Sequence, residues 1–441
     1  MRVGILPLGR PTFDVPYAEE KLAGMLRQLD RSGHEIVGPR ALIMGPDEAA
    51  LEAVAGADVL LILQVTFTDA AFASRAVEGF HGRIAVWAVP EPRVGGRLRL
   101  NAFCGLNLLS HTLGLRGRAF AWAYGDEVDL GALLEGPEVA PKRGGASDAE
   151  PVAIRRDLRI ARIGEHPAGF DTCRYDAGEL RALTGAVVTE LPLPKLFNLA
   201  KGLPDSAVAP YAAGAKELEG ISALDAGEVD RSLRLAGALE GLRAEHRFDA
   251  MAIRCWPECF TEYGGAVCGP AAMLAERRAP CACEADVWGA VTQAILQDVA
   301  DAPVFLADMV DFDEETGVVW HCGQAPASMA ATRPAATVHT NRRQALLLEF
   351  ALRPGRVTLF RLSQARGQPQ VVIATGEAIE APMAFTGTSG TIRFDRGAGA
   401  VRDDLMASGL EHHMALTYGD HAPALRGVAA GLGLPVLELG A

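Results

Sequence analysis

The sequence predicts an α/β protein with two parallel-sheet domains followed by a β-rich C-terminal domain, antiparallel or barrel-like. Short apolar strands alternate with helical segments in the first third of the chain, and the same alternation returns between about residues 154 and 312. Beyond about residue 325, strands follow one another across short Gly and Pro turns. A chain of 441 residues is too long to fold around a single hydrophobic core, and its length predicts about two to four domains.

The first domain is predicted over residues 1–150. Its strands are RVGIL, VLLILQV and RIAVWAV, which begin at residues 2, 59 and 83, with helical patterns at 17–33 and 47–57. This order indicates a parallel sheet with helices on both faces. Residues 134–153 lose the periodicity and are rich in Pro, Gly and Ser, which predicts a linker.

The second domain is predicted over residues 151–322, with a helix ending near 186, a strand at 186–192, a long helix around 225–245 and a strand at 248–257. Apolar residues recur every four positions from Val287 to Val299, the spacing of a buried helix face. The continuous apolar run at 304–307 predicts a strand buried on both faces, with Asp308 at its carboxyl end. That end of an open α/β sheet is where ligands bind.

The third domain is predicted over residues 323–441. Its strands lie in the segments 345–364, 369–381 and 390–395, and a last helix and strand fill 422–439. Few helical patterns interrupt these strands, so a small antiparallel sheet or barrel is expected.

Composition excludes several classes of protein. A net charge of -13 argues against nucleic-acid binding, which needs clustered Lys and Arg. The apolar runs are shorter than the ~20 residues that span a bilayer, and the N-terminus lacks a secretory pattern. The eight cysteines are dilute and show no C-x2-C pair, so reduced thiols of a cytoplasmic protein are favoured over disulfides or structural zinc.

Acidic residues stand at the start of the predicted buried helix. Glu284 and Asp286 precede it directly, and the next strand brings Asp308, so Glu284 and Asp308 are expected at one edge of the sheet. Helix capping is the alternative interpretation, especially for Asp286. Converging carboxylates repel, and a divalent cation offsets that repulsion. Oxygen donors with an imidazole suit Mn2+, Mg2+ or Co2+.

Histidines near the C-terminus offer the imidazole. His412, His413 and His421 lie within ten residues, and His321 is a further candidate. If the segment is a strand, His412 and His413 point to opposite faces, so at most one of them is expected in a given site.

Several motifs together resemble the L-fucose isomerase / L-arabinose isomerase family of metal-dependent aldose–ketose isomerases, in particular its shorter fucose-isomerase-like members. They are RCWPE (254–258), CEAD (283–286), the FLAD that ends at Asp308, WHCG (320–323) and HHMALTYGD (412–420). WAVPEP (87–92) and LNAFCGLN (100–107) are weaker matches. The motifs span most of the chain.

The resemblance implies two Rossmann-like domains, a β-rich third domain and a Mn2+ ion. It implies that Glu284, Asp308 and His413 bind the metal, His413 because it stands six residues before the Gly of T-Y-G. The two acids would also serve as base and acid around an enediol intermediate. Asp286 would orient Glu284 or cap the helix. The resemblance also suggests a set of substrate-binding residues: Arg10, which would reach a neighbour's sugar, Arg254, Trp256, His321 and Tyr418.

The same resemblance implies a homo-oligomer, a hexamer or trimer-based, with active sites near subunit interfaces. The substrate stays open among fucose, arabinose, another pentose or deoxyhexose, and an anionic sugar such as a sulfonated hexose. Two other classes also stay open. One is a metal-dependent aldolase or lyase that shares the enediolate, and the other is a non-catalytic sugar-binding protein.

Overall fold

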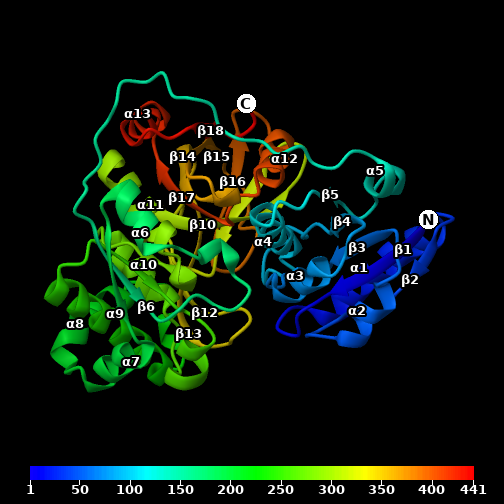
Figure 1. Cartoon of the computed structure of the whole chain (residues 1–441). Coiled ribbons are helices and arrows are strands. Elements are labelled where there is room, and N and C mark those ends of the chain that lie inside the picture. The colour runs from blue at the N-terminus through cyan, green and yellow to red at the C-terminus, as the bar shows by residue number, and fades with distance from the viewer.

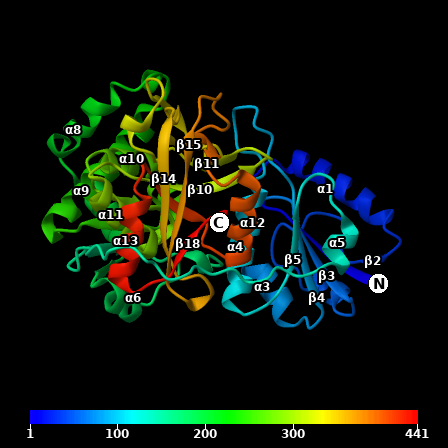
Figure 2. The ribbon, with the colours of Figure 1, turned by 90° about the horizontal axis from the view of Figure 1, so that it is seen from above.

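The computed structural model describes all 441 residues and contains three β-sheets. The N-terminal part of the chain, blue to cyan, forms one side of the molecule, and the green second part lies at the other side (Figure 1). The C-terminal part, yellow to red, lies between them when the molecule is seen from above (Figure 2). The predicted fold class, two parallel-sheet α/β units and a β-rich C-terminal unit, is confirmed.

The N-terminal sheet is parallel, with the strand order β2-β1-β3-β4-β5. Its strands are β1 (Arg2–Leu8), β2 (Glu35–Val37), β3 (Val59–Gln64), β4 (Arg83–Ala88) and β5 (Ala121–Tyr124). Its helices are α1 (Val15–Asp30), α2 (Glu48–Val54), α3 (Ala71–Glu78), α4 (Ala102–Leu115) and α5 (Leu130–Glu135). Every residue of β3 is buried, as its unbroken apolar run predicts.

The second sheet is also parallel, with the order β7-β6-β8-β9. Its strands are β6 (Arg159–Ile163), β7 (Val187–Leu191), β8 (Ala250–Ile253) and β9 (Cys281–Ala282). The accompanying helices are α6 (Ala177–Thr184), α7 (Leu193–Gly202), α8 (Asp205–Ala215), α9 (Ala226–His246), α10 (Cys268–Glu276) and α11 (Val287–Ala300). Helix α11 is the predicted buried helix, and the side chain of Asp286 caps it by accepting a hydrogen bond from Gly289 N.

The third sheet has nine strands in the order β12-β13-β16-β11-β10-β17-β14-β15-β18, and β16 also pairs with β15. That extra pairing closes the strands from β16 to β15 into an antiparallel barrel, which has no open edge. The strands are β10 (Phe305–Phe312), β11 (Gly317–His321), β12 (Ala335–Val338), β13 (Ala345–Ala351), β14 (Gly355–Ser363), β15 (Gln370–Ala378), β16 (Thr388–Phe394), β17 (His413–Tyr418) and β18 (Val436–Glu438). Helices α12 (Ala398–Ser408) and α13 (Ala422–Leu432) complete this part.

One prediction about this region is wrong. Strand β10 pairs with β11 and β17 in the barrel rather than with the second parallel sheet. Asp308 therefore lies inside an antiparallel strand, not at the carboxyl end of a parallel one. A continuous apolar run indicates that both faces of a strand are buried. A covered strand of a barrel is buried on both faces, as a strand of a parallel sheet is, so the run does not distinguish the two. The predicted domain boundary after residue 322 consequently cuts the barrel, whose first strand begins at Phe305.

The predicted linker crosses the C-terminal part of the molecule, as the teal loop above α13 and α12 shows (Figure 1). Gly145 and Val436 exchange two backbone hydrogen bonds, and Val152 N donates to Gly427 O. These bonds tie the linker to the barrel's outer elements. None of the helices combines the length and the hydrophobicity that crossing a bilayer requires.

Candidate active site and metal centre

Three segments that are distant in sequence bring Glu284, Asp308 and His413 together. Glu284 lies in a short 3-10 turn between β9 and α11, and Asp308 and His413 are direct partners in the pairing of β10 with β17. Glu284 has φ 58° and ψ 23°, a left-handed conformation that non-glycine residues seldom adopt. Such strain persists only where the surroundings enforce it, and it gathers at functional sites.

The polar atoms of these three residues point at one another. His413 Nε2 lies 3.8 Å from Glu284 Oε2 and 3.6 Å from Asp308 Oδ1. Asp308 Oδ1 and His413 Nε2 are buried and have no hydrogen-bond partner. Buried polar atoms are rarely left unpaired, and two of them facing the same point need a common partner. Two carboxylates and an imidazole are a donor set that fits a divalent cation such as Mn2+, Mg2+ or Co2+.

Asp286 holds His413 in place. Its Oδ2 lies 2.9 Å from His413 Nδ1, which leaves Nε2 as the ring nitrogen that faces Glu284 and Asp308. Asp286 also caps α11 and accepts hydrogen bonds of 2.6 and 3.2 Å from Arg361. Burial alone raises the pKa of Asp286, but the Arg361 guanidinium and His413 together hold it well below its usual range. Asp286 therefore caps α11, as the capping interpretation expects, and it positions His413 rather than Glu284.

Two further buried charged residues, Arg361 and Glu411, support the site and were not predicted from the sequence. Arg361 is fully buried, and its Nε lies 3.9 Å from Glu411 Oε2. Glu411 in turn accepts hydrogen bonds of 2.7 Å from Ser363 Oγ and Gln364 N. The signal for Arg361 was present, because a lone cation in the strand VTLFRLS needs a buried anion. The sequence did not reveal which anion.

His412 is also at the site, so the expectation that only one of the two neighbouring histidines joins is wrong. His412 Nε2 lies 2.9 Å from Glu284 Oε2, and the two imidazole rings are 3.9 Å apart. Strand β17 begins at His413, so His412 precedes it and does not follow the alternation of a strand. Burial raises the pKa of Glu284, but the hydrogen bond and charge of His412 outweigh it and lower that pKa overall.

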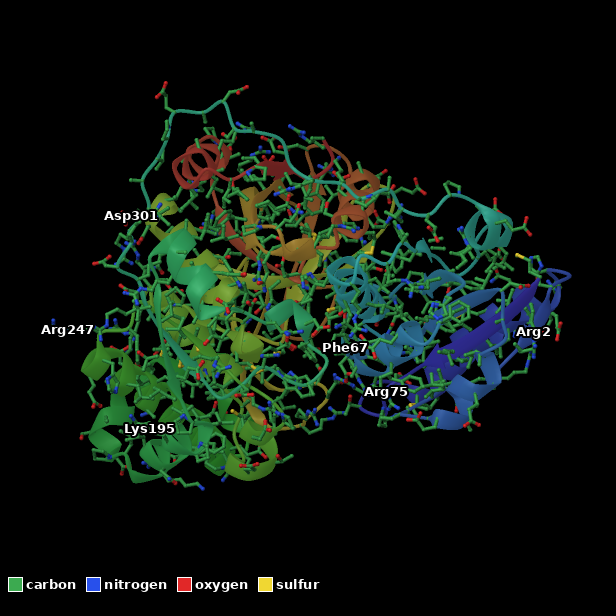
Figure 3. All side chains as sticks on the ribbon, viewed as in Figure 1. Arg2, Phe67, Arg75, Lys195, Arg247 and Asp301 are labelled. Atoms are coloured by element: carbon green, nitrogen blue, oxygen red, sulfur yellow. The ribbon has the colours of Figure 1, made fainter.

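A cavity of about 100 Å³ opens beside this centre, between the N-terminal part and the other two. Phe67, labelled in Figure 3 where the blue and green regions meet, lines it together with Trp256 and His321. Trp256 donates a hydrogen bond of 3.1 Å from Nε1 to Glu284 Oε1. Burial raises the pKa of Asp308 to about 6, with His321 and His413 opposing the shift. Trp256 and His321 thus lie beside a cavity, where the resemblance places substrate-binding residues.

Two predicted substrate-binding residues do not line this cavity. Arg254 turns away, with Nε 2.6 Å from Glu258 Oε2 and Nη1 on the carbonyl of Glu165. Tyr418 lies at the far end of β17, about 16 Å along the strand from His413 at the usual rise per residue. Its hydroxyl donates to the carbonyl oxygen of Arg353. Both residues were predicted near the site because they belong to its motifs. The side chain of Arg254 points away from the cavity, and the length of β17 separates Tyr418 from His413.

Arg10 lines the cavity of its own chain, whereas the resemblance implied that it reaches a neighbour's sugar. Its Nη2 lies 2.5 Å from Asp69 Oδ2. The loop after β1 approaches the second domain closely enough to place this side chain there. The eight cysteines are all free, as expected of reduced thiols, and all are buried. Several of them line the same cavity.

Comparisons with known proteins identify the family of the chain. Residues 4–132 match the family model "Fucose/sulfoquinovose isomerase, N-terminal domain". Residues 319–440 match "L-fucose isomerase, C-terminal domain". The two matches lie on either side of the second parallel sheet, which carries Glu284.

Curated relatives match nearly the whole chain. A sulfoquinovose isomerase of Alkalicoccus urumqiensis is 34% identical over 448 residues, which cover 98% of each chain. One of Priestia megaterium is 30% identical over 428 residues, and one of Clostridium sp. is 29% identical over 436 residues. These cover 94% and 95% of each chain, respectively. Isomerase function is therefore favoured over the lyase and the non-catalytic sugar-binding protein. The chain belongs to the fucose/sulfoquinovose isomerase family and is an aldose–ketose isomerase.

Proposed function

We propose that the protein is a metal-dependent isomerase of a sulfonated aldohexose, sulfoquinovose, with Glu284, Asp308 and His413 as metal ligands. One observation carries the metal part: Asp308 Oδ1 and His413 Nε2 are buried without partners and lie 3.6 Å apart, next to Glu284. The substrate is supported by the relatives that match 94% or more of this chain, all of which are sulfoquinovose isomerases.

The metal is proposed to be Mn2+, with Mg2+ or Co2+ as substitutes, because the donors are two carboxylates and an imidazole without a thiolate. When bound, such a cation stabilises negative charge on two neighbouring sugar oxygens. Asp286 supports this role, since it fixes the ring of His413 with Nε2 toward the carboxylates.

The side chains perform the proton transfers. One carboxylate removes the proton from C2 of the aldose while O1 gains a proton, which gives the enediol. The O2 proton then leaves as a proton returns to C1, and the ketose results. We assign the base and acid roles to Glu284 and Asp308, which flank His413 Nε2. Trp256 and His412 orient Glu284 through hydrogen bonds of 3.1 and 2.9 Å.

The proposal includes a homo-oligomeric cytoplasmic enzyme. The resemblance of the motifs supports the oligomer, with active sites near its subunit interfaces. The eight free thiols support a reducing compartment.

The test is an assay of the EDTA-treated protein with sulfoquinovose, with and without added Mn2+, followed by NMR of the sugar. We expect the ketose isomer of unchanged mass to form only when the metal is present. Equal turnover without metal would remove the metal from the proposal. Turnover of fucose or arabinose in preference to sulfoquinovose would overturn the substrate.

A further inference from the structure

Two arginines lie beside the indole of Trp256 in the active-site cavity. Arg10 Cζ is 5.4 Å and Arg342 Cζ is 5.7 Å from the centre of its ring system. The same indole donates from Nε1 to Glu284. Trp256 thus joins an acidic end of the cavity, where the metal ligands gather, to a cationic end that the isomerisation chemistry does not use.

The cationic end carries an uncompensated positive charge. Arg10 is paired with Asp69 at 2.5 Å, whereas Arg342 makes no ion pair. Arg10 and Arg342 contribute two positive charges and Asp69 one negative charge, so the group has a net charge of +1. Burial and the nearby charge of Arg10 lower the pKa of Arg342, and no carboxylate opposes that shift. A half-buried cation beside another cation is stabilised by an anionic ligand.

The loop between β12 and β13 is built to present this group. His339 Nδ1 lies 3.2 Å from Asn341 N and 3.3 Å from Arg342 N, so the loop's own backbone is held in position. At the end of the loop, Ala345 N donates to Glu228 Oε2 at 2.9 Å. Asn341 also lines the cavity, and its buried side-chain oxygen has no partner. The amide therefore loses no hydrogen bond to its oxygen when its NH2 group faces an anion.

We infer that Arg342 and Arg10, with the amide of Asn341, bind the sulfonate on C6 of the sugar. This inference rests on the proposed function, which places C1 and C2 of the same sugar beside Glu284 and Asp308. A sulfonate carries one negative charge and neutralises the net +1 of the group. A phosphate ester carries about -1.5 to -2 at neutral pH and leaves excess negative charge in the cavity. The site therefore selects a sulfonated hexose over a phosphorylated one and over an uncharged one.

The test compares three sugars that differ at C6: sulfoquinovose, glucose 6-phosphate and quinovose, the uncharged 6-deoxyglucose. Arg342→Ala is expected to lower kcat/KM for sulfoquinovose about 10- to 100-fold, chiefly through KM, because one charge-assisted contact is lost. Turnover of quinovose is expected to stay within twofold. Arg343→Gln is the matched control, because Arg343 is exposed in the same loop and does not line the cavity. It is expected to change neither sugar's kinetics.

An equal loss on sulfoquinovose and quinovose would show that Arg342 only shapes the cavity, and would overturn the inference while leaving the isomerase intact. A preference of the wild type for glucose 6-phosphate would overturn it as well. Binding of the non-reacting sulfonated alditol, followed by tryptophan fluorescence, separates the two proposals. If wild type binds it, Arg342→Ala does not, and no sulfoquinovose is isomerised, the anion site stands and the proposed function fails. If wild type does not bind it, the anion site is wrong.

Discussion

Glu284 and Asp286 are two residues apart and have opposite surroundings. The carboxylate of Asp286 is fully engaged by Arg361, by the backbone of Gly289 and by His413. Glu284 has hydrogen bonds from Trp256 and His412, yet it stands beside His413 Nε2 and Asp308 Oδ1, which have none. A saturated carboxylate supports the structure. A carboxylate beside buried polar atoms that have no hydrogen-bond partner marks the place for a ligand.

The largest expected effect is the loss of activity when a carboxylate beside the unpartnered atoms, Glu284 or Asp308, is replaced. Glu284→Gln and Asp308→Asn are each expected to lower kcat by about 10²- to 10⁴-fold, because each removes a proton-transferring group and a metal ligand. Glu262→Gln, at an exposed position, is the matched control and should retain full activity. Steady-state kinetics with saturating Mn2+ measure the effect. Full turnover by Glu284→Gln would contradict the assigned role.

Removing the cation that pairs with the fully hydrogen-bonded Asp286 should instead lower the free energy of unfolding. Arg361→Met is expected to destabilise the protein by about 3–5 kcal/mol, because Asp286 becomes a buried charge without its cation. Urea unfolding of the metal-free protein measures this difference. The double variant Asp286→Asn/Arg361→Met should recover part of the loss, since it removes both charges. A double variant no more stable than the single one would mean that the pair does not interact as described.

Asp308 should show the reverse behaviour when metal is absent. Its pKa of about 6 exceeds the unfolded value, so the folded protein is stabilised by its proton at low pH and loses that stabilisation as pH rises from about 4 to about 6. Asp308→Asn should therefore be more stable than wild type in EDTA at pH 7.5, by about 2–3 kcal/mol. The gap should shrink toward pH 5. A pH-independent gap would point to a packing change.

The smallest effect is expected where the sequence motif and the structure disagree. Tyr418→Phe removes a hydroxyl that donates to the carbonyl of Arg353, outside the cavity. It should cost about 0.5–1.5 kcal/mol of stability and leave kcat and KM within twofold of wild type. Thermal unfolding and kinetics on one preparation check both parts. A raised KM would return Tyr418 to the substrate site.

Local apolar patterns predicted the parallel sheets, because β3 is a continuous apolar run and α11 repeats apolar residues every four positions. They misplaced β10, since burial on both faces does not say which strands are the neighbours. The candidate site was likewise predicted only in part. The motifs gave Glu284, Asp308 and His413, whereas Arg361 depends on a partner 75 positions away. His412 depended on where β17 begins, a boundary that alternation does not set.

The central claim is most directly tested by anomalous diffraction from crystals of the Mn2+-loaded protein. The account predicts one manganese peak at bonding distance from Glu284, Asp308 and His413 Nε2, with Asp286 still on His413 Nδ1. A peak coordinated by Asp286, or one distant from all three ligands, would contradict it.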